Sequence, residues 1–202
     1  MKTSNFIKLI MLFAILAVSS LNNMVYADEN ATEPGSADSR LFTESSVITG
    51  FGSGNIDEGN YQPILLIWHM GVDLNGFFHA QKDCKGNLSL YLEPQINPVV
   101  NPETDIECGI GLGFKFMYPV TDSLSTYILG GAGPHYISVN TRKQANGFMF
   151  SDTIGAGFYY FLTKKSAVNV GYRFRHMSNI GLAKPNHGID NHFGTIGYSI
   201  FF

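Results

Sequence analysis

The sequence contains few charged residues and, beyond its first 27 positions, no apolar run long enough to cross a membrane as a helix. Asp, Glu, Lys and Arg make up 14% of its 202 residues, and the net charge of −3 provides no basic surface for a nucleic acid. The histidines show neither a helical i, i+4 pair nor a Cys/His cluster, so no metal site is predicted. No internal repeat is visible. These absences exclude membrane-spanning helices beyond residue 27 and disfavour a nucleic-acid-binding or metal-dependent protein.

Cysteine is scarce too, because Cys84 and Cys108 are the two in the chain. A disulfide between them is chemically allowed if the protein is exported, but the sequence cannot show whether their Cα atoms come close enough to bond. Two unpaired buried or lipid-facing thiols are the alternative. Aromatic residues, by contrast, form 13% of the chain, which also contains 22 glycines. Low charge with many aromatics and glycines favours a β-rich chain.

The first 27 residues have the pattern of a secretory signal peptide. Lys2 and Lys8 give a positive start, and the apolar segment Leu9 to Val18 follows. Small or modest side chains then lead up to Ala27, after which we expect cleavage. The apolar segment is too short to span a bilayer, although an uncleaved anchor helix is the alternative. Residues 28–44 are polar and are predicted to form a flexible lead-in, so the folded domain is expected at 45–202.

Eight β-like segments, separated by turn chemistry, follow the lead-in. We expect strands at 45–54, 60–74, 86–97, 104–118, 124–139, 147–161, 166–178 and 190–202.

Side chains alternate in the last two of these segments. Even positions from Val168 to Phe174 are apolar, whereas odd positions include Arg173 and Arg175. Even positions from Ile196 to Phe202 are apolar as well. A period of two puts each set on its own face of the sheet. A soluble sandwich would bury the apolar face, whereas a membrane barrel turns it toward lipid and keeps the arginines inside.

The predicted signal peptide, the even number of strands and the aromatic terminus at Phe202 favour the barrel. The fold class predicted is all-β, an eight-stranded antiparallel transmembrane β-barrel of the outer membrane, in which closure gives every backbone group a partner. The aromatic end resembles the signal read by the barrel-assembly machinery. With both termini periplasmic, connections after even-numbered strands should be short. The long link 179–189 therefore faces outside the cell, although the link 75–85 is longer than this rule expects.

The segment 176–190 reads HMSNIGLAKPNHGID. Its pattern H-x-S-N-x-G-L-x-x-P-N-x-G, with the preceding Gly171-Tyr172-Arg173 and the terminal strand, resembles the lipid A 3-O-deacylase (PagL) family of outer-membrane esterases. The resemblance covers the last third of the chain. It implies a serine nucleophile at Ser178, a histidine base at His176 and an acid at Asp190. The family's acid is commonly Glu, so the shorter Asp190 must approach the imidazole more closely.

The alternation of side chains supports this assignment. His176 and Ser178 are two residues apart and share one face of their strand, where the ring and hydroxyl can meet. Asp190 opens the next strand and can reach the other ring nitrogen, which would fix the tautomer. By parity, all three side chains face lipid. Polar groups facing lipid are costly, which suits a substrate that arrives sideways from the membrane. Ordinary interface and turn residues are the alternative.

Asn179, Asn186 and Gly181 are candidates for the oxyanion or substrate-binding groups, through side-chain amides or backbone N–H groups. Turn chemistry explains Asn and Gly in a loop equally well. The resemblance thus predicts a serine esterase that removes the acyl chain at the 3-position of lipid A. This chemistry needs no cofactor. A homodimer is one assembly that the protein could form. The alternative function is a non-enzymatic small barrel that stabilises the envelope or binds a surface partner.

Overall fold

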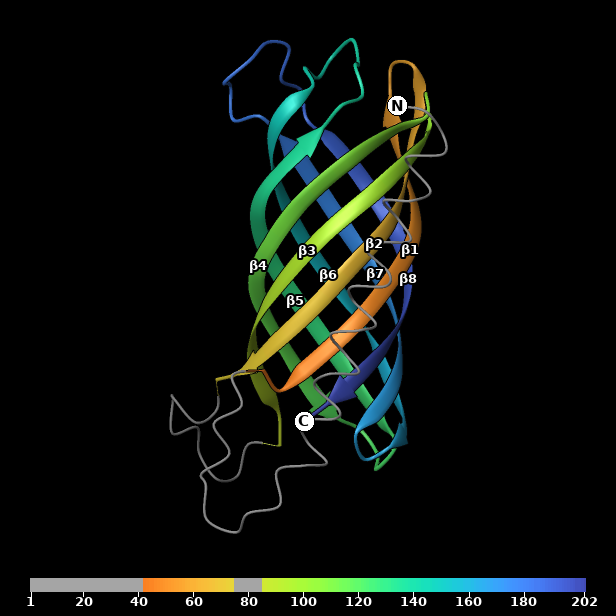
Figure 1. Ribbon diagram of the computed structural model, residues 1–202, viewed down its shortest axis with the longest axis vertical. Coiled ribbons are helices and arrows are strands. Elements are labelled where there is room, and N and C mark those ends of the chain that lie inside the picture. Colours follow the sequence, from red (N-terminus) through yellow and green to blue (C-terminus); the bar gives the residue numbers. More distant parts are fainter. Residues whose placement is uncertain (1–41, 75–84) are drawn as a thin grey trace.

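The computed structural model describes residues 42–74 and 85–202, which form a closed barrel of eight antiparallel strands, each paired with its neighbours in sequence (Figure 1). The strands are β1 (Glu44–Ile56), β2 (Gly59–Asp73), β3 (Asn87–Asn101), β4 (Asp105–Pro119), β5 (Leu124–Ile137), β6 (Gly147–Thr163), β7 (Ser166–Ser178) and β8 (Ile189–Phe201). Pairing of β8 with β1 closes the barrel. Among the described residues, no helix is long and apolar enough to cross a membrane.

The predicted fold class is therefore confirmed, and the predicted strands correspond one to one with those of the barrel. The bounds of β7 agree with the prediction, whereas β1 and β3 extend further toward their β1–β2 and β3–β4 connections than expected. The signal peptide, most of the lead-in and Cys84 lie outside the described residues. β2 ends at Asp73 and β3 begins at Asn87, so the link between them is long, as its sequence indicated.

Alternation decides which side chains face the membrane. Even positions of β7 and β8 point outward, and Val170 and Ile196 are more than half exposed there. Odd positions point into the barrel, where Arg173 and Arg175 are buried, as predicted. Inside, Arg173 donates two hydrogen bonds, of 2.7 and 2.8 Å, to Glu93. Arg175 donates two to Glu107, of 2.6 and 3.1 Å. Two-pronged pairing of this kind is what stabilises charges removed from water.

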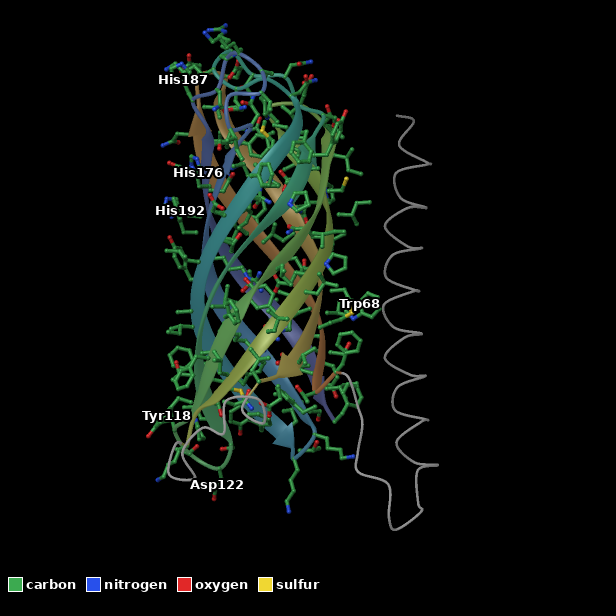
Figure 2. The ribbon with its side chains drawn as sticks, turned by 90° about the vertical axis from the view of Figure 1, so that its left-hand side faces the viewer. Trp68, Tyr118, Asp122, His176, His187 and His192 are labelled. Atoms are coloured by element: carbon green, nitrogen blue, oxygen red, sulfur yellow. The ribbon has the colours of Figure 1, made fainter. Side chains whose placement is uncertain are left out.

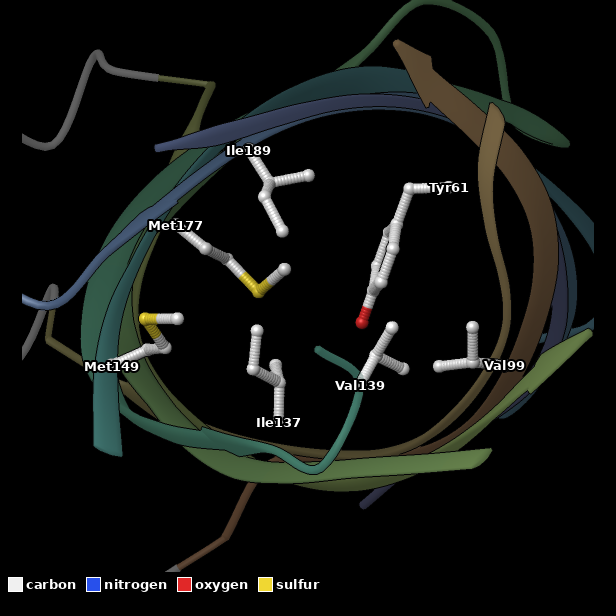
Figure 3. Packing of buried hydrophobic residues seen from close by; sticks show 7 residues of the cluster. All are labelled: Tyr61, Val99, Ile137, Val139, Met149, Met177 and Ile189. Atoms are coloured by element: carbon white, nitrogen blue, oxygen red, sulfur yellow. The ribbon is translucent and has the colours of Figure 1, made fainter. Parts of the chain in front are cut away.

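Apolar side chains fill the barrel next to the Arg175–Glu107 pair, at the end where β7 finishes and β8 begins. Figure 3 shows this cluster inside the ring of strands. Its members are Tyr61, Val99, Ile137, Val139, Met149, Met177 and Ile189. Tyr61 joins it to the charges below, because its hydroxyl donates a 2.8 Å hydrogen bond to Glu107. Side chains thus fill this part of the interior, which gives the neighbouring outer surface a rigid support.

The two ends of the barrel differ. One end, which we call the loop end, carries the β5–β6 loop (138–146) and the β7–β8 loop (179–188), together with the tight β1–β2 hairpin. The opposite end, the turn end, carries the short connections 120–123 and 164–165 and the end of β8 (Figure 1). Asp122 lies at the turn end and His187 at the loop end (Figure 2).

Candidate active site

The three predicted catalytic side chains come from two neighbouring strands at the loop end. His176 and Ser178 are on β7, and Asp190 is the cross-strand partner of His176 on β8. Nδ1 of His176 lies 2.6 Å from Oδ1 of Asp190. The histidine side chain is 39% exposed and the aspartate 61%, while Arg175 and Met177, the neighbours of His176 along β7, point inward and are buried. The structure therefore brings an imidazole–carboxylate pair together on the outer surface of the barrel.

Direct pairing explains how the short Asp190 side chain reaches the ring. Residues that face each other on antiparallel strands have Cβ atoms about 4.5–5.5 Å apart, so a carboxylate needs no extra methylene to span the gap. The bond leaves Nε2 as the ring nitrogen available to Ser178, two residues along the same face. Among the described residues, no hydrogen bond joins the Ser178 hydroxyl to the His176 ring. In the absence of substrate, the distance between a catalytic hydroxyl and its base is often too long for a hydrogen bond.

Gly188 packs against the edge of the histidine ring. Its φ of +79° is a conformation that residues with a side chain adopt at a cost. A Cβ added there would lie 2.5 Å from Cε1 of His176. The glycine is therefore required twice over, by its backbone conformation and by the close approach of the imidazole. A larger residue at this position would displace the ring.

The β7–β8 loop is organised by its two asparagines. Asn179 is buried, and its amide is committed to the loop: Oδ1 accepts a 3.0 Å hydrogen bond from the backbone N–H of Gly181 and Nδ2 donates a 2.9 Å one to Ala183. The Oδ1 atom of Asn186 accepts from the backbone N–H of Asn179 at 2.9 Å. Of these three oxyanion candidates, Asn186 alone retains an amide N–H₂ group with no acceptor among the described residues.

Sequence reasoning missed the contribution of the β5–β6 loop. Gln144 on this loop is buried, and its Oε1 accepts a 2.8 Å hydrogen bond from the backbone N–H of Gly188. Two backbone hydrogen bonds add to the contact, from Ala145 to Pro185 and from His187 to Lys143. The β5–β6 loop thus fixes the glycine that packs on His176. Nothing in the local pattern around Gln144 indicates this, because the contact joins loops 44 residues apart.

Three further polar side chains lie on the same outer surface. Asp152 on β6 is the cross-strand partner of His176 on the side away from Asp190, and it is exposed. The hydroxyl of Tyr172 lies 2.5 Å from Nδ1 of His192, one step further from the loop end (Figure 2). The sequence alone did not indicate these residues, because the strand register that places them near the histidine joins different strands. The described residues contain no cluster of three or more His, Cys, Asp or Glu side chains suited to a metal ion.

A closed barrel with an apolar outer band and an interior of paired arginine and glutamate side chains defines a transmembrane protein of the outer membrane. The ionisable cluster on its lipid-facing surface is the feature expected of one that acts on membrane lipids. The family model for lipid A 3-O-deacylase (PagL) matches residues 68–199. The chain therefore belongs to the lipid A 3-O-deacylase family, and its location is the outer membrane. The match extends well beyond the terminal motif and includes strands from β2 onward.

Solved structures share the fold. The crystal structure of the outer membrane enzyme PagL aligns with a TM-score of 0.57 at 21% identity, over 79% of this chain and 99% of that one. The crystal structure of Neisserial surface protein A aligns with a TM-score of 0.52 at 11% identity, over 79% of this chain and 96% of that one. A comparison with curated protein sequences finds no match. At these identities the structural likenesses establish the barrel alone.

Proposed function

We propose that this lipid A deacylase hydrolyses the ester at the 3-position of lipid A, with Ser178 as nucleophile, His176 as base and Asp190 as orienting acid. The observation that carries the proposal is the 2.6 Å contact between His176 Nδ1 and Asp190 Oδ1 on the lipid-facing surface. An exposed histidine–carboxylate pair beside a serine is the arrangement that activates a hydroxyl for attack. Its place on the outside of the barrel suits a substrate that never leaves the membrane.

The reaction proceeds in two halves. The Ser178 hydroxyl attacks the ester carbonyl while Nε2 of His176 accepts its proton, and the imidazolium that forms is stabilised by Asp190. Collapse of the tetrahedral intermediate breaks the bond to the sugar oxygen, which takes the proton from His176. Water then attacks the acyl-enzyme while His176 accepts its proton, and the bond to Ser178 Oγ breaks as that oxygen takes the proton back, which releases the fatty acid and restores the serine. No cofactor enters these steps.

Asn186 is the proposed donor to the oxyanion. Its Oδ1 atom accepts a hydrogen bond from the backbone of Asn179, which restrains the side chain before substrate binds and leaves the N–H₂ group able to donate. One such donor contributes about 3 kcal/mol of transition-state stabilisation in serine hydrolases. Asn179 and Gly181 act indirectly by holding the loop in place.

The test is expression in a Gram-negative host that lacks such an activity, followed by mass spectrometry of its lipid A. The parent should remove one hydroxyacyl chain, and analysis of the remaining esters should place the loss at the 3-position. Ser178→Ala and His176→Ala should each abolish the loss while leaving a heat-modifiable barrel, and the double variant should be hardly worse than either single one. Full deacylation by Ser178→Ala would disprove the serine mechanism, and loss of a different chain would disprove the assigned position.

A further inference from the structure

A hollow in the outer surface of the barrel lies close to the candidate active site without containing any of its polar groups. It extends across β3 to β6 and has a volume of about 460 Å³. Its outward-facing lining residues include Ile96, Cys108, Ile110, Pro134, Tyr136 and Phe148. The volume falls in the range of sites that take small ligands, about 300–1,000 Å³. The composition of these walls suits a hydrocarbon ligand.

Strand register connects the hollow to the nucleophile. Ser178 faces Phe150 across β6–β7, and Phe150 faces Pro134 across β5–β6. The same outer surface continues to Ile110 and its partner Pro94. Phe148, which forms the near wall, makes an edge-to-face contact with Phe150 at 5.2 Å between ring centroids. With neighbouring strands about 4.8 Å apart, Ile110 lies three strands, or roughly 14 Å, from Ser178.

The path from the site to the hollow descends into the membrane. A row of paired residues runs from Asp190 through His176 and Asp152 and reaches Met70 on β2. Asp190 is the second residue of β8 at the loop end, whereas Met70 is close to the turn end of β2. Because the strands tilt, a step from β7 toward β3 along such a row moves away from the loop end (Figure 1).

The depth of the hollow agrees with that of an outer-leaflet acyl chain. On β4, Cys108 is ten residues from Tyr118, an exposed tyrosine near the turn end (Figure 2). Ten residues rise about 34 Å along a strand and about 26 Å along the axis of a barrel whose strands tilt by about 40°. The apolar band of such a barrel is about 25 Å tall. The hollow is therefore at the outer edge of that band, where the chains of an outer-leaflet lipid begin.

We propose that this hollow binds a second, non-reacting acyl chain of the same glycolipid whose ester is cleaved at Ser178. The inference rests on the proposed function. A multi-chain lipid whose scissile ester is at Ser178 carries its other chains sideways and downward from the same headgroup, which is the direction of the hollow. Binding energy from a chain remote from the reaction holds the ester in place and selects lipids that carry several chains. A flexible hydrocarbon chain can enter and fill the concave hollow. The convex wall of a second barrel would instead contact only its rim and leave the hollow empty.

Filling the hollow provides the first test. Cys108→Trp places a large ring in it, and Ile128→Trp, on the outer surface of β5 away from the hollow, is the matched control. Each variant is assayed in micelles with lipid A and with a single-chain p-nitrophenyl ester, which has no second chain to bind. We expect the ratio of lipid A turnover to single-chain ester turnover to fall about tenfold or more in Cys108→Trp. The ratio in Ile128→Trp should match the parent.

Failure of this proposal can be told apart from failure of the proposed function. If the parent hydrolyses neither substrate, or Ser178→Ala hydrolyses both, the esterase assignment is wrong. An unchanged ratio in Cys108→Trp, or an equal loss with both substrates, would overturn the chain-binding site alone. If Cys108→Trp converts a dimer to a monomer and also loses activity on both substrates, the hollow would be assigned to contact with a second copy of the chain. If Cys108→Trp fails to assemble, Ile96→Phe serves as the smaller filling variant, with the same outcomes.

A binding measurement independent of turnover provides the second test. Cys108 is a free thiol that lies exposed on the outer surface. In a Ser178→Ala, Cys84→Ser protein it is the remaining thiol, and its alkylation by a membrane-soluble maleimide can be timed. Lipid A added to the micelles should slow the alkylation severalfold, while an equal mass of single-chain ester should not. Equal alkylation rates in the two micelles would refute occupancy of the hollow.

Discussion

Asp190 and His176 are cross-strand partners on the outside of the barrel, and 2.6 Å separates Oδ1 of the aspartate from Nδ1 of the histidine. The pairing means that the acid is placed by the sheet itself, through the register between β7 and β8, although it is only the second residue after the β7–β8 loop. A shorter side chain than the family's usual glutamate is sufficient because the two backbones are already adjacent. We infer that Asp190 serves the role for which the family commonly has a glutamate.

Removal of the charge at Asp190 should therefore impair deacylation strongly. Asp190→Asn keeps the size of the side chain but can no longer stabilise the imidazolium, and a comparable change in a serine protease costs on the order of 10⁴ in turnover. Asp190→Glu should retain activity. The measurement is lipid A mass spectrometry on membranes with matched barrel levels, with Asp122→Asn at the turn end as control. Parent-like deacylation by Asp190→Asn would show that Asp190 has no role in catalysis.

Gly188 should tolerate no side chain. Gly188→Ala introduces a Cβ 2.5 Å from Cε1 of His176, so the ring must move. Displacement of a catalytic group by about 1 Å can cost about 100-fold in rate. Gly147→Ala is the matched control, because its φ of +98° imposes similar backbone strain but a Cβ there meets nothing within 4 Å. Turnover per heat-modifiable barrel should fall in Gly188→Ala and remain near the parent in Gly147→Ala. Equal turnover in the two variants would show that the close contact between Gly188 and the His176 ring is not needed for activity.

Removal of one partner from a buried charge pair should destabilise the barrel more than removal of one partner from an exposed pair. Glu107→Gln leaves Arg175 inside the barrel without its full negative partner, and breaking a buried pair of this kind costs about 3–5 kcal/mol. Glu58→Gln, at the exposed contact with Arg142, should cost under about 1 kcal/mol. Urea unfolding followed by the electrophoretic shift of the folded barrel measures both. Similar midpoints for the two variants would show that the interior pair adds little.

The orientation of the barrel predicts which loops antibodies can reach. An epitope tag inserted at Lys184, in the β7–β8 loop, should be detected on intact cells, because the long loops of outer-membrane barrels face outward. A tag at Lys164, in the short β6–β7 connection, should be detected after the membrane is opened. Labelling of intact cells at Lys164 but not at Lys184 would invert the barrel and place the candidate site in the inner leaflet.

Much of the site could be predicted because it depends on local spacing. His176 and Ser178 are two residues apart in a strand, and a period of two is enough to place them on one face. The apolar residues at even positions then identify that face as the lipid-facing one. Arg173 and Arg175 were assigned to the interior by the same argument, and their burial confirms it.

What the sequence by itself determined is the set of eight alternating segments, the side of the sheet that each residue occupies and the motif 176–190 that identifies the family. Those properties depend on backbone geometry within one strand and on the chemistry of adjacent residues. The tertiary structure alone decided which residues from different strands meet. Strand register makes Asp190, which the motif already implied, the direct partner of His176 and adds Asp152 on the other side. Loop contacts place Gln144 against Gly188, and the tilt of the closed sheet leads from Ser178 to the hollow. Such relationships join residues far apart in the chain, and closure of the barrel is what sets their distance.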